Sequence, residues 1–352
     1  RPTKHISSLV GCMARGTLLM KGVTDSTKGY WQWHPPLPLE TVPVLVWPPR
    51  PAAALKHLLS FAFLGSIILP FGALAIVIWV YLQPALERCV EFQPDWILQM
   101  YGRNLGLMIL ITGGLHLYFY TYKRQGARRK FDPRDLDRKN RKYFGNNQVW
   151  DNIFWSCASG ITIATAYEVF FMWGYANDLL PFYLDWKKHP IWFVSTLIAI
   201  PFWSSIHFYL IHRLLHWKPL YKLAHAVHHR NDNIGPWSGI SMHPIEHVIY
   251  LSSILIHAVV ASHPVHIFFH TSWNTIGAAA SHTGFESITI RGKPVLLLGS
   301  FHHQLHHRFH NCNYGNFLVR CDQWFGTDHD GTPEAWDKIR KRQQNRRSPM
   351  PS

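Results

Sequence analysis

The sequence predicts an all-α, multi-pass membrane protein with about four transmembrane helices, a re-entrant apolar hairpin and a histidine-rich cap on the cytosolic side. Three observations support this fold class. Charged residues make up only 16% of the 352 residues, whereas about 25% is usual in soluble proteins. Several long stretches contain almost no charged side chains. Finally, 18 of the 24 histidines lie between residues 207 and 310.

Four apolar segments have the length of a membrane crossing, which takes about 20 residues of helix. They cover residues 58–82, 105–122, 152–174 and 190–211, and aromatic residues near their ends are typical interface anchors. The third segment contains one carboxylate, Glu168. Because a charge inside the membrane is costly, we expect Glu168 to have a function.

A fifth apolar stretch, residues 248–281, has a different form. It contains no Asp, Glu, Lys or Arg over 34 residues. As one helix it would be about 50 Å long, which exceeds a bilayer core of about 30 Å. The sequence Ser262-His263-Pro264 interrupts it near the middle. We therefore predict two half-depth helices or a re-entrant hairpin.

The basic residues indicate how the chain is oriented. Residues 123–142 contain ten Lys or Arg, whereas residues 83–103 and 175–189 contain two each. The positive-inside rule places 123–142 in the cytoplasm, together with both termini and the histidine-rich region. The net charge of +15 is then explained by membrane topology, and no nucleic-acid partner is expected. The membrane would be the endoplasmic reticulum in a eukaryote or the inner membrane in a bacterium.

Composition also divides the chain into four regions. We expect an amino-terminal membrane-surface arm at 1–57, a first transmembrane hairpin with a basic cytoplasmic loop at 58–150, a catalytic domain at 151–332 and a basic tail at 333–352. The five cysteines are odd in number and form no C-x-x-C pair, so a disulfide framework is not expected and a reducing compartment is the simpler interpretation.

Three histidine motifs have the spacing of metal ligands on helices. They are H-R-L-L-H at 212–216, H-A-V-H-H at 225–229 and H-Q-L-H-H at 303–307. Positions i, i+3 and i+4 share one helix face, so each motif presents two or three imidazoles in one direction. Neutral imidazole binds iron, zinc or copper. Eight such side chains exceed the capacity of one ion, which predicts a site for two metal ions.

Together with further motifs, these boxes resemble the fatty acid hydroxylase and sterol desaturase superfamily of integral-membrane diiron enzymes. The further motifs are H-P-I-E at 243–246, H-T-G-F at 282–285, N-Y-G at 313–315 and D-Q-W-F-G-T at 322–327. The resemblance covers about residues 150–332. The H-P-x-E, N-Y-G and D-x-x-F-G-T elements are more similar to the sterol desaturase branch.

The resemblance implies a set of metal ligands and a set of neighbouring residues that support them. The implied ligands are His212, His216, His225, His228, His229, His243, His282, His303, His306 and His307. The supporting candidates are Glu246, Asn313, Asp322, His207 and His310. We expect the four histidines of the apolar hairpin, His257, His263, His266 and His270, to be structural.

The resemblance also implies a reaction. Two iron ions would use O2 as co-substrate, with electrons from an external carrier, to hydroxylate or desaturate a lipid. A sterol is the first expectation for the substrate and a fatty-acyl lipid the second, with part of the pocket formed by 248–281. The basic cytoplasmic face suits an acidic electron-transfer protein, either cytochrome b-type or ferredoxin-like.

Two other functions remain open at this point. A zinc-dependent membrane hydrolase would also use histidines, although one zinc takes only three or four protein ligands. A haem-binding membrane electron carrier would use histidines within the spans, such as His116 and His207. Metal analysis and the oxygen dependence of product formation distinguish these functions from the diiron enzyme.

Overall fold

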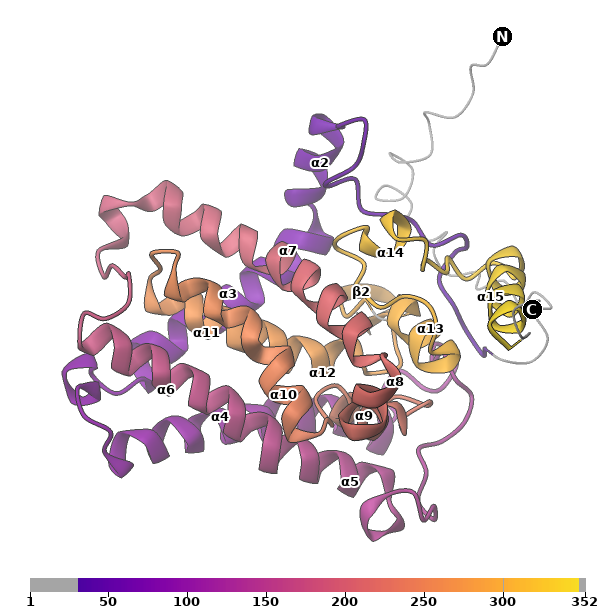
Figure 1. Ribbon diagram of the computed structural model, residues 1–352, viewed down its shortest axis with the longest axis horizontal. Helices are drawn as coiled ribbons and strands as arrows, with labels where there is room; N and C mark the ends of the chain where they lie inside the picture. Colours follow the sequence, from indigo (N-terminus) through magenta and orange to yellow (C-terminus); the bar gives the residue numbers. More distant parts are fainter. Residues whose placement is uncertain (1–30, 300, 348–352) are drawn as a thin grey trace, which may run out of the picture.

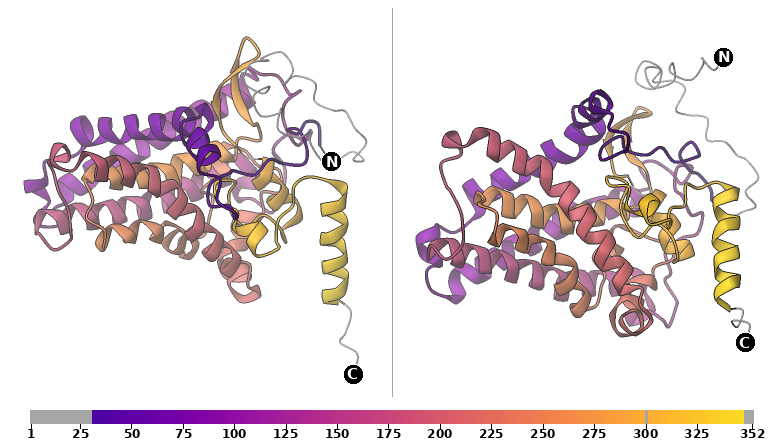
Figure 2. Two further views of the ribbon diagram at one scale, coloured as in Figure 1. Left: turned by 90° about the horizontal axis from the view of Figure 1, so that it is seen from above. Right: turned by 45° about the horizontal axis from the view of Figure 1, so that its top comes forward.

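The computed structural model describes residues 31–299 and 301–347. These residues are mostly helical, and the long helices run side by side while the histidine-bearing segments gather at one end of the bundle (Figures 1 and 2). Most of the arm predicted at 1–57 lies outside the described residues. The part from residue 31 to α2 (Pro51–Leu58) is irregular.

Among the described residues, three helices are long and apolar enough to cross a membrane. The first is Phe61–Leu82, which contains α3 (Leu69–Val77). The second is Gln148–Ala176, which contains α5 (Gln148–Trp155) and α6 (Thr162–Ala176), and the third is α7 (Pro190–Leu215). These three correspond to three of the four predicted spans.

The remaining predicted span, 105–122, lies in a continuous helix formed by α4 (Pro94–His116) and its extension Leu117–Thr121. This helix has sufficient length, but it is not among those apolar enough to count as a candidate span. Polar residues within it, including Asn104, Thr112 and His116, reduce its hydropathy. The prediction of four crossings is therefore supported for three segments only.

The apolar stretch 248–281 forms two helical arms that are separated near Ser262. The first arm is α10 (Pro244–Leu251) followed by Ser252–Ala258. The second is α11 (Pro264–Ser272) followed by Trp273–Gly277 and α12 (Ala278–Ser281). Pro264 begins α11, and the ring of His263 caps it by accepting a hydrogen bond from the backbone of Val265. The predicted break is thus present, whereas re-entry into the membrane stays a prediction.

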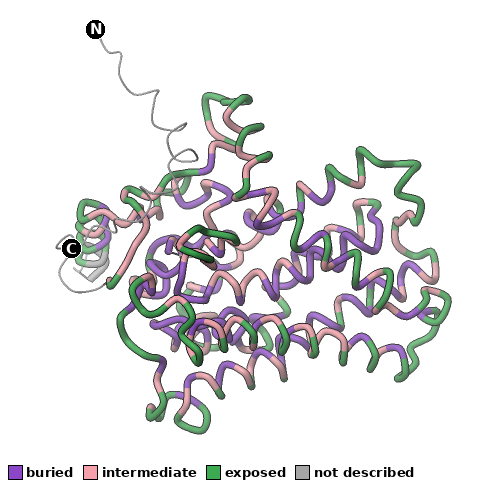
Figure 3. The backbone as a smooth tube through the Cα atoms, turned by 180° about the vertical axis from the view of Figure 1, so that it is seen from behind, coloured by how far each residue is buried: buried purple, intermediate pink, exposed green. Residues whose placement is uncertain are grey.

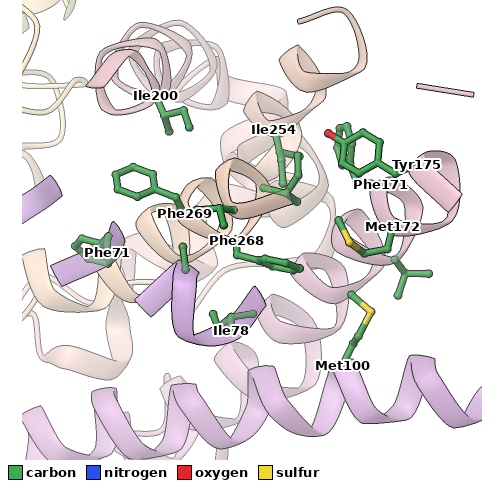
Figure 4. Packing of buried hydrophobic residues seen from close by; sticks show 14 of the residues in the cluster. Phe71, Ile78, Met100, Phe171, Met172, Tyr175, Ile200, Ile254, Phe268 and Phe269 are labelled. Carbon is green, nitrogen blue, oxygen red and sulfur yellow. The ribbon is translucent and has the colours of Figure 1, made fainter. Parts of the chain in front are cut away.

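Helix α11 lies at the centre of the bundle. All nine of its residues are buried, and it contacts α3, α6 and α7. Phe268 and Phe269 of α11 pack in the main apolar core, together with Phe71 of α3 and Phe171 of α6 (Figure 4). Figure 3 shows that buried backbone runs along the middle of the bundle and exposed backbone at its edges. Helix α11, in the second arm of the hairpin, is therefore the buried helix around which α3, α6 and α7 pack.

One polar group within this bundle is closely paired. The Glu168 carboxylate accepts hydrogen bonds from the guanidinium of Arg103 and from the amide of Asn104. The side chains of both Arg103 and Glu168 are almost completely buried. The Glu168 carboxylate thus has a cationic partner on α4, as a buried charge requires.

A small antiparallel sheet modifies the all-α prediction. Strands β1 (Ser287–Ile290) and β2 (Lys293–Leu297) pair with each other. Arg291 and Gly292 join them with positive φ angles of 48° and 79°, as a two-residue hairpin turn requires. The structure is therefore mostly helical, with one two-stranded sheet among the described residues.

The cap is completed by shorter elements around the histidines. These are α8 (Lys218–Leu220), α9 (Ala226–His229), α13 (Phe301–Phe309), α14 (Cys321–Trp324) and α15 (Pro333–Arg347). The irregular arm packs on this cap: Trp33 stacks on Phe131, with ring centroids 5.9 Å apart, and Trp31 contacts the edge of Phe301. The backbone of Leu39 donates a hydrogen bond to the Asp330 carbonyl.

Candidate metal centre

Nine histidines converge in two adjacent groups that could each hold a metal ion. Centre A consists of His212, His216, His225, His229 and His306, and centre B consists of His228, His282, His303 and His307. Within each group the potential ligand nitrogens lie within 4.8 Å of one another. The two groups touch, because the ring centroids of His228 and His229 are 5.8 Å apart and those of His306 and His307 are also 5.8 Å apart.

The two H-x-x-H-H motifs each supply both centres. In the first motif, His225 and His229 belong to centre A and His228 to centre B. In the second, His306 belongs to centre A whereas His303 and His307 belong to centre B. Residues i and i+4 thus share one ion site, and the residue at i+3 is directed to the other site. The end of α7 adds His212 and His216, and His282 follows the last residue of α12.

The hydrogen bonds at the outer ring nitrogens determine which nitrogen faces the interior of centre A. Nδ1 of His212 lies 2.6 Å from the Tyr314 carbonyl oxygen, and Nδ1 of His306 lies 2.6 Å from the Cys312 carbonyl oxygen. A carbonyl oxygen only accepts, so both Nδ1 atoms carry the hydrogen. In a neutral ring, Nε2 is then a bare lone pair. Nδ1 of His225 similarly faces the Glu246 carboxyl group at 2.6 Å.

The inward-facing nitrogens of centre A have the spacing of neighbouring ligands of one ion. Nε2 of His212, whose hydrogen is on Nδ1, lies 3.0 Å from Nε2 of His225. Adjacent ligands about 2.1 Å from one ion and at right angles would lie about 3 Å apart. The donor set therefore fits a transition-metal ion.

Centre B has the same construction. Nδ1 of His282 lies 2.8 Å from the Ala278 carbonyl oxygen, so its Nε2 faces the group. That Nε2 is 3.1 Å from Nε2 of His307, which is 3.2 Å from Nε2 of His303. The spacing is the same as in centre A, and four imidazoles leave room for further ligands on an ion of higher coordination number.

Burial keeps the cap histidines in the neutral form that metal binding requires. Six of these histidines have a pKa well below the ordinary value, and burial is the largest cause in each case. They are His225, His228, His229, His303, His306 and His307. The neighbouring imidazoles lower these pKa values further, because two positive rings would repel each other. Each ring therefore offers a lone pair at neutral pH.

Two of the predicted supporting residues contact the site through defined hydrogen bonds. Glu246 is 2% exposed and faces His225 directly. Burial raises the pKa of Glu246 well above its usual value, and a cation held by His225 would oppose that shift. Asp322 contacts the site indirectly. Its carboxylate accepts hydrogen bonds from the backbone N–H groups of Tyr314 and Gly315 and so positions the Tyr314 carbonyl, which orients His212.

The structure does not bring the other predicted residues into either group. His243 caps α10, where its Nδ1 accepts from the backbone of Ile245. Nε2 of His207 pairs with the Ser252 hydroxyl. Asn313 joins the backbone of His302 and His329, and His310 packs beside the ring of His229 without joining the group. His243 is therefore left out of the proposed ligand set.

The carbonyl acceptors are the part of the site that sequence reasoning missed. Cys312, Tyr314 and Ala278 act through the main chain, so no side-chain motif marks them. The N-Y-G motif at 313–315 gave an indirect signal, because its positive φ at Asn313 and its contacts to Asp322 shape this loop.

A large apolar cavity opens onto centre B. Its volume is about 840 Å³, and its wall includes His228, His282 and His303 but no histidine of centre A. The cavity extends between the first span, α4, α7 and the second arm of the hairpin, as predicted for 248–281, and residues 35–40 of the arm form another part of its wall. Ligand pockets for small organic molecules have volumes of this order.

Comparisons with known proteins cover the same region. Residues 196–327 match the family model described as fatty acid hydroxylase. The chain is 29% identical over 167 residues to a Delta(7)-sterol-C5(6)-desaturase of Nicotiana tabacum, covering 44% of this chain and 56% of the relative. It is 31% identical over 144 residues to a Delta(7)-sterol 5(6)-desaturase of Gibberella zeae, covering 40% and 43%.

A third relative is methylsterol monooxygenase 1 of Rattus norvegicus, which is 28% identical over 153 residues, covering 41% of this chain and 50% of the relative. The chain thus spans about half the length of the curated relatives it matches, and no solved structure matches it. All nine clustered histidines fall inside residues 196–327. Residues 196–327 are therefore similar to the fatty acid hydroxylase family, and the relatives named above are sterol desaturases and a methylsterol monooxygenase.

Proposed function

We propose that this protein is a membrane-bound diiron oxygenase that hydroxylates or desaturates a lipid, with a sterol preferred over a fatty-acyl lipid. The observation that carries the proposal is the convergence of nine neutral imidazoles in two touching groups, one of which lines an apolar cavity. The names of the relatives, sterol desaturase and methylsterol monooxygenase, support an oxidation of a lipid ring system.

A bound pair of iron ions would supply the activation of O2 that an unactivated C–H bond requires. The chain's own residues would do the rest. The nine histidines hold the ions, and the carbonyls of Cys312, Tyr314 and Ala278 fix the ring orientations. The apolar cavity orients the lipid beside centre B and excludes water. Each turnover would consume O2 and two electrons from an external donor.

The electron donor is proposed to dock on the cytoplasmic face. The basic loop 123–142 lies against the cap, where Arg134 and Lys142 both pair with Asp232, close in the sequence to His229. Several of its other basic residues are exposed. An acidic carrier of the cytochrome b or ferredoxin type would match this charge.

The alternative functions fit the site less well. A zinc hydrolase needs one ion with three or four protein ligands and an open position, whereas nine imidazoles in two groups exceed that need. A haem carrier would need two free histidines within the spans. Nδ1 of His116 is buried without a hydrogen-bond partner, but the second predicted candidate, His207, has its Nε2 at 3.0 Å from the Ser252 hydroxyl.

The test combines metal analysis with product formation. We expect about two iron ions per purified chain and a lipid product that requires O2, identified by mass spectrometry of lipids from cells with and without the protein. His228→Ala and His306→Ala should abolish product while the protein stays membrane-inserted. His243→Ala is the matched control, because it removes a nearby histidine that belongs to neither group.

Two outcomes would overturn the proposal. The first is zinc with oxygen-independent turnover. The second is full activity in both His228→Ala and His306→Ala. A Soret band in the purified wild-type protein would instead favour the haem carrier.

A further inference from the structure

The two metal centres have different surroundings. All four histidines of centre B are buried, and the apolar cavity borders this centre. Four histidines of centre A are buried as well, but the fifth, His216, is partly exposed. Among the nine clustered histidines, His216 is thus the one that solvent reaches. Centre B therefore faces the cavity, and centre A faces the outer surface of the cap.

An aromatic side chain separates centre A from the cavity. The ring of Phe208 stacks on the ring of His212, with centroids 4.7 Å apart and an angle of 24° between the planes. Its centroid also lies 6.0 Å from that of His303 in centre B. Phe208 lines the cavity, whereas His212 does not. A lipid in the cavity would therefore contact Phe208 at this point and not the imidazole behind it.

Two side chains, Tyr221 and His310, cover the outer edge of centre A. The ring centroid of Tyr221 lies 5.6 Å from that of His216 and 5.7 Å from that of His229. The ring of His310 packs beside His229 at 4.5 Å, and its Nδ1 lies 3.4 Å from the Tyr221 hydroxyl. Both Tyr221 and His310 are partly exposed. The rings next to centre A are thus themselves in contact with solvent.

The surface at this edge is basic. Lys218 lies three residues before Tyr221, and Lys222 follows it directly. Both lysine side chains are exposed, and neither forms an ion pair with another residue in 31–299 or 301–347. Their charges are therefore available to a partner.

The same edge continues into the basic loop 123–142. Arg230 follows the last histidine of the first H-x-x-H-H motif, and its guanidinium donates to the Lys142 carbonyl at 2.8 Å. The carboxylates in this region are already paired: Asp151 with Arg230, and Asp232 with Lys142 and a second loop cation. The surface around the outer edge of centre A thus keeps an excess of positive charge.

We propose that electrons enter the site through centre A, across the edge formed by His216, Tyr221 and His310, and that the lipid meets centre B. The partner at this edge is an acidic protein that carries one electron, which the basic surface attracts and orients. Redox partners associate transiently over small contact areas, so a short exposed edge is sufficient. This inference rests on the proposed function, because it identifies where the external donor of that function binds.

Two carriers are needed in succession. Each carrier loses one electron, and the two electrons together reduce two ferric ions to the ferrous state, so no bond forms or breaks in this step. Electron transfer slows steeply with distance, which favours entry at the partly exposed edge over a path through the apolar bundle. Because the lipid binds beside the other centre, a docked carrier and a bound lipid do not compete for space.

The test measures electron transfer without turnover. The probe is the soluble haem domain of cytochrome b5, an acidic carrier of one electron. The reduced probe is mixed, without O2 or lipid substrate, with the whole ferric protein in nanodiscs of phosphatidylcholine, which has no net charge. Haem absorbance in a stopped-flow instrument records the oxidation of the probe, and we expect two probe molecules to be oxidised per chain. The affinity of the oxidised probe for the same protein is a second readout.

Charge reversal tests the docking face. Combined Lys218→Glu and Lys222→Glu should lower the second-order rate constant by about tenfold or more at low salt, because electrostatic steering contributes at least that factor. At about 1 M salt, where charges are screened beyond about 3 Å, the difference should disappear. The matched control is combined Lys338→Glu and Lys341→Glu, on exposed lysines of α15 in another part of the cap (Figure 1). The control should react like wild type, and all variants should keep the wild-type iron content.

Removal of one ion at a time tests which centre receives the electron. His303→Ala removes a ligand of centre B, and the remaining ion should accept one electron per chain at the wild-type rate. His225→Ala removes a ligand of centre A, and this variant should lose the fast phase of probe oxidation. If either variant loses both ions, the charge-reversal variants decide the question.

The outcomes for the two proposals can be separated. An unchanged rate and affinity in the Lys218→Glu and Lys222→Glu variant overturns the entry route, as does an equal effect of the α15 control or fast probe oxidation by His225→Ala with one ion bound. Entry through this edge without any O2-dependent lipid product would keep the route and remove the oxygenase. Lipid product from a protein whose reduction is insensitive to this edge would do the reverse.

Discussion

Replacing Glu246 by glutamine tests whether the hydrogen bond to His225 sets the metal affinity of centre A. The two side chains are 2.6 Å apart, and both are at most 2% exposed. Glutamine keeps the shape and one acceptor oxygen but removes the charge that a metal-bound imidazole favours. A hydrogen bond to a charged group contributes about 1.5–3 kcal/mol and a neutral one about 1 kcal/mol. The difference is about 0.5–2 kcal/mol, and its upper half includes the value of about 1.4 kcal/mol that corresponds to a tenfold loss of affinity.

The assay is a chelator titration of the purified protein that records metal ions per chain. Wild-type protein should release both ions over one range of chelator concentration. Glu246→Gln should release one ion at about tenfold lower chelator and retain the other, because centre B has no contact with Glu246. Ser159→Ala, which breaks a comparable buried contact to the non-ligand His247, should behave like wild type.

Two results would refute this reasoning. Wild-type affinity in Glu246→Gln would show that the carboxylate does not support the ligand. Simultaneous loss of both ions would show that the two groups bind metal as one unit and cannot be assigned separately.

Three further predictions concern the same site. Gly239→Ala should release metal from centre B, because the new methyl group would collide with the Ala278 carbonyl that orients His282, whereas Gly72→Ala, in open space, should bind metal normally. Asp322→Ala should remove two buried backbone hydrogen bonds and one from a hydroxyl. We expect this to lower the free energy of unfolding by more than about 3 kcal/mol in thermal melts and to weaken the metal binding of centre A in the chelator titration. Burial lowers the pKa of the clustered cap histidines, so protons compete with the metal only at pH values below those lowered pKa values. Metal analysis at pH 5.5 should therefore find both ions still bound. Loss of half of the bound metal near the ordinary imidazole pKa of about 6.5 would contradict this prediction.

Helical spacing in the three histidine motifs indicated eight of the nine histidines that the structure brings together, because ligands at i, i+3 and i+4 share a face. The ninth, His282, lies outside these motifs and was implied only by the family resemblance. His243 differs because it begins a helix rather than lying within one, so its ring binds its own backbone. Each H-x-x-H-H motif supplies histidines to both centres. Which histidine belongs to which centre depends on how four separate segments pack together, and the spacing within one motif does not determine this.

The fold shows the same division between local and long-range information. Hydropathy located three spans, and Pro264 located the break in the hairpin. The β1–β2 sheet was missed because its strands have only four and five residues and their turn, Arg291-Gly292, is a weak signal in isolation. The sequence also could not predict that α11 lies inside the bundle, because a helix surrounded by lipid and a helix surrounded by protein have the same apolar composition.

The amino-terminal arm has a consequence for how the substrate range of such an enzyme changes. Residues 35–40 form part of the cavity wall, yet they lie far outside the matched region 196–327, which contains every clustered histidine. The proposed metal centre and this portion of the cavity are thus encoded by segments that can diverge independently. If the proposed function is correct, a chimaera that exchanges residues 31–50 between homologues should alter the fit of the lipid and leave the chemistry intact, a route by which natural selection or protein engineering could change the substrate of the same metal centre.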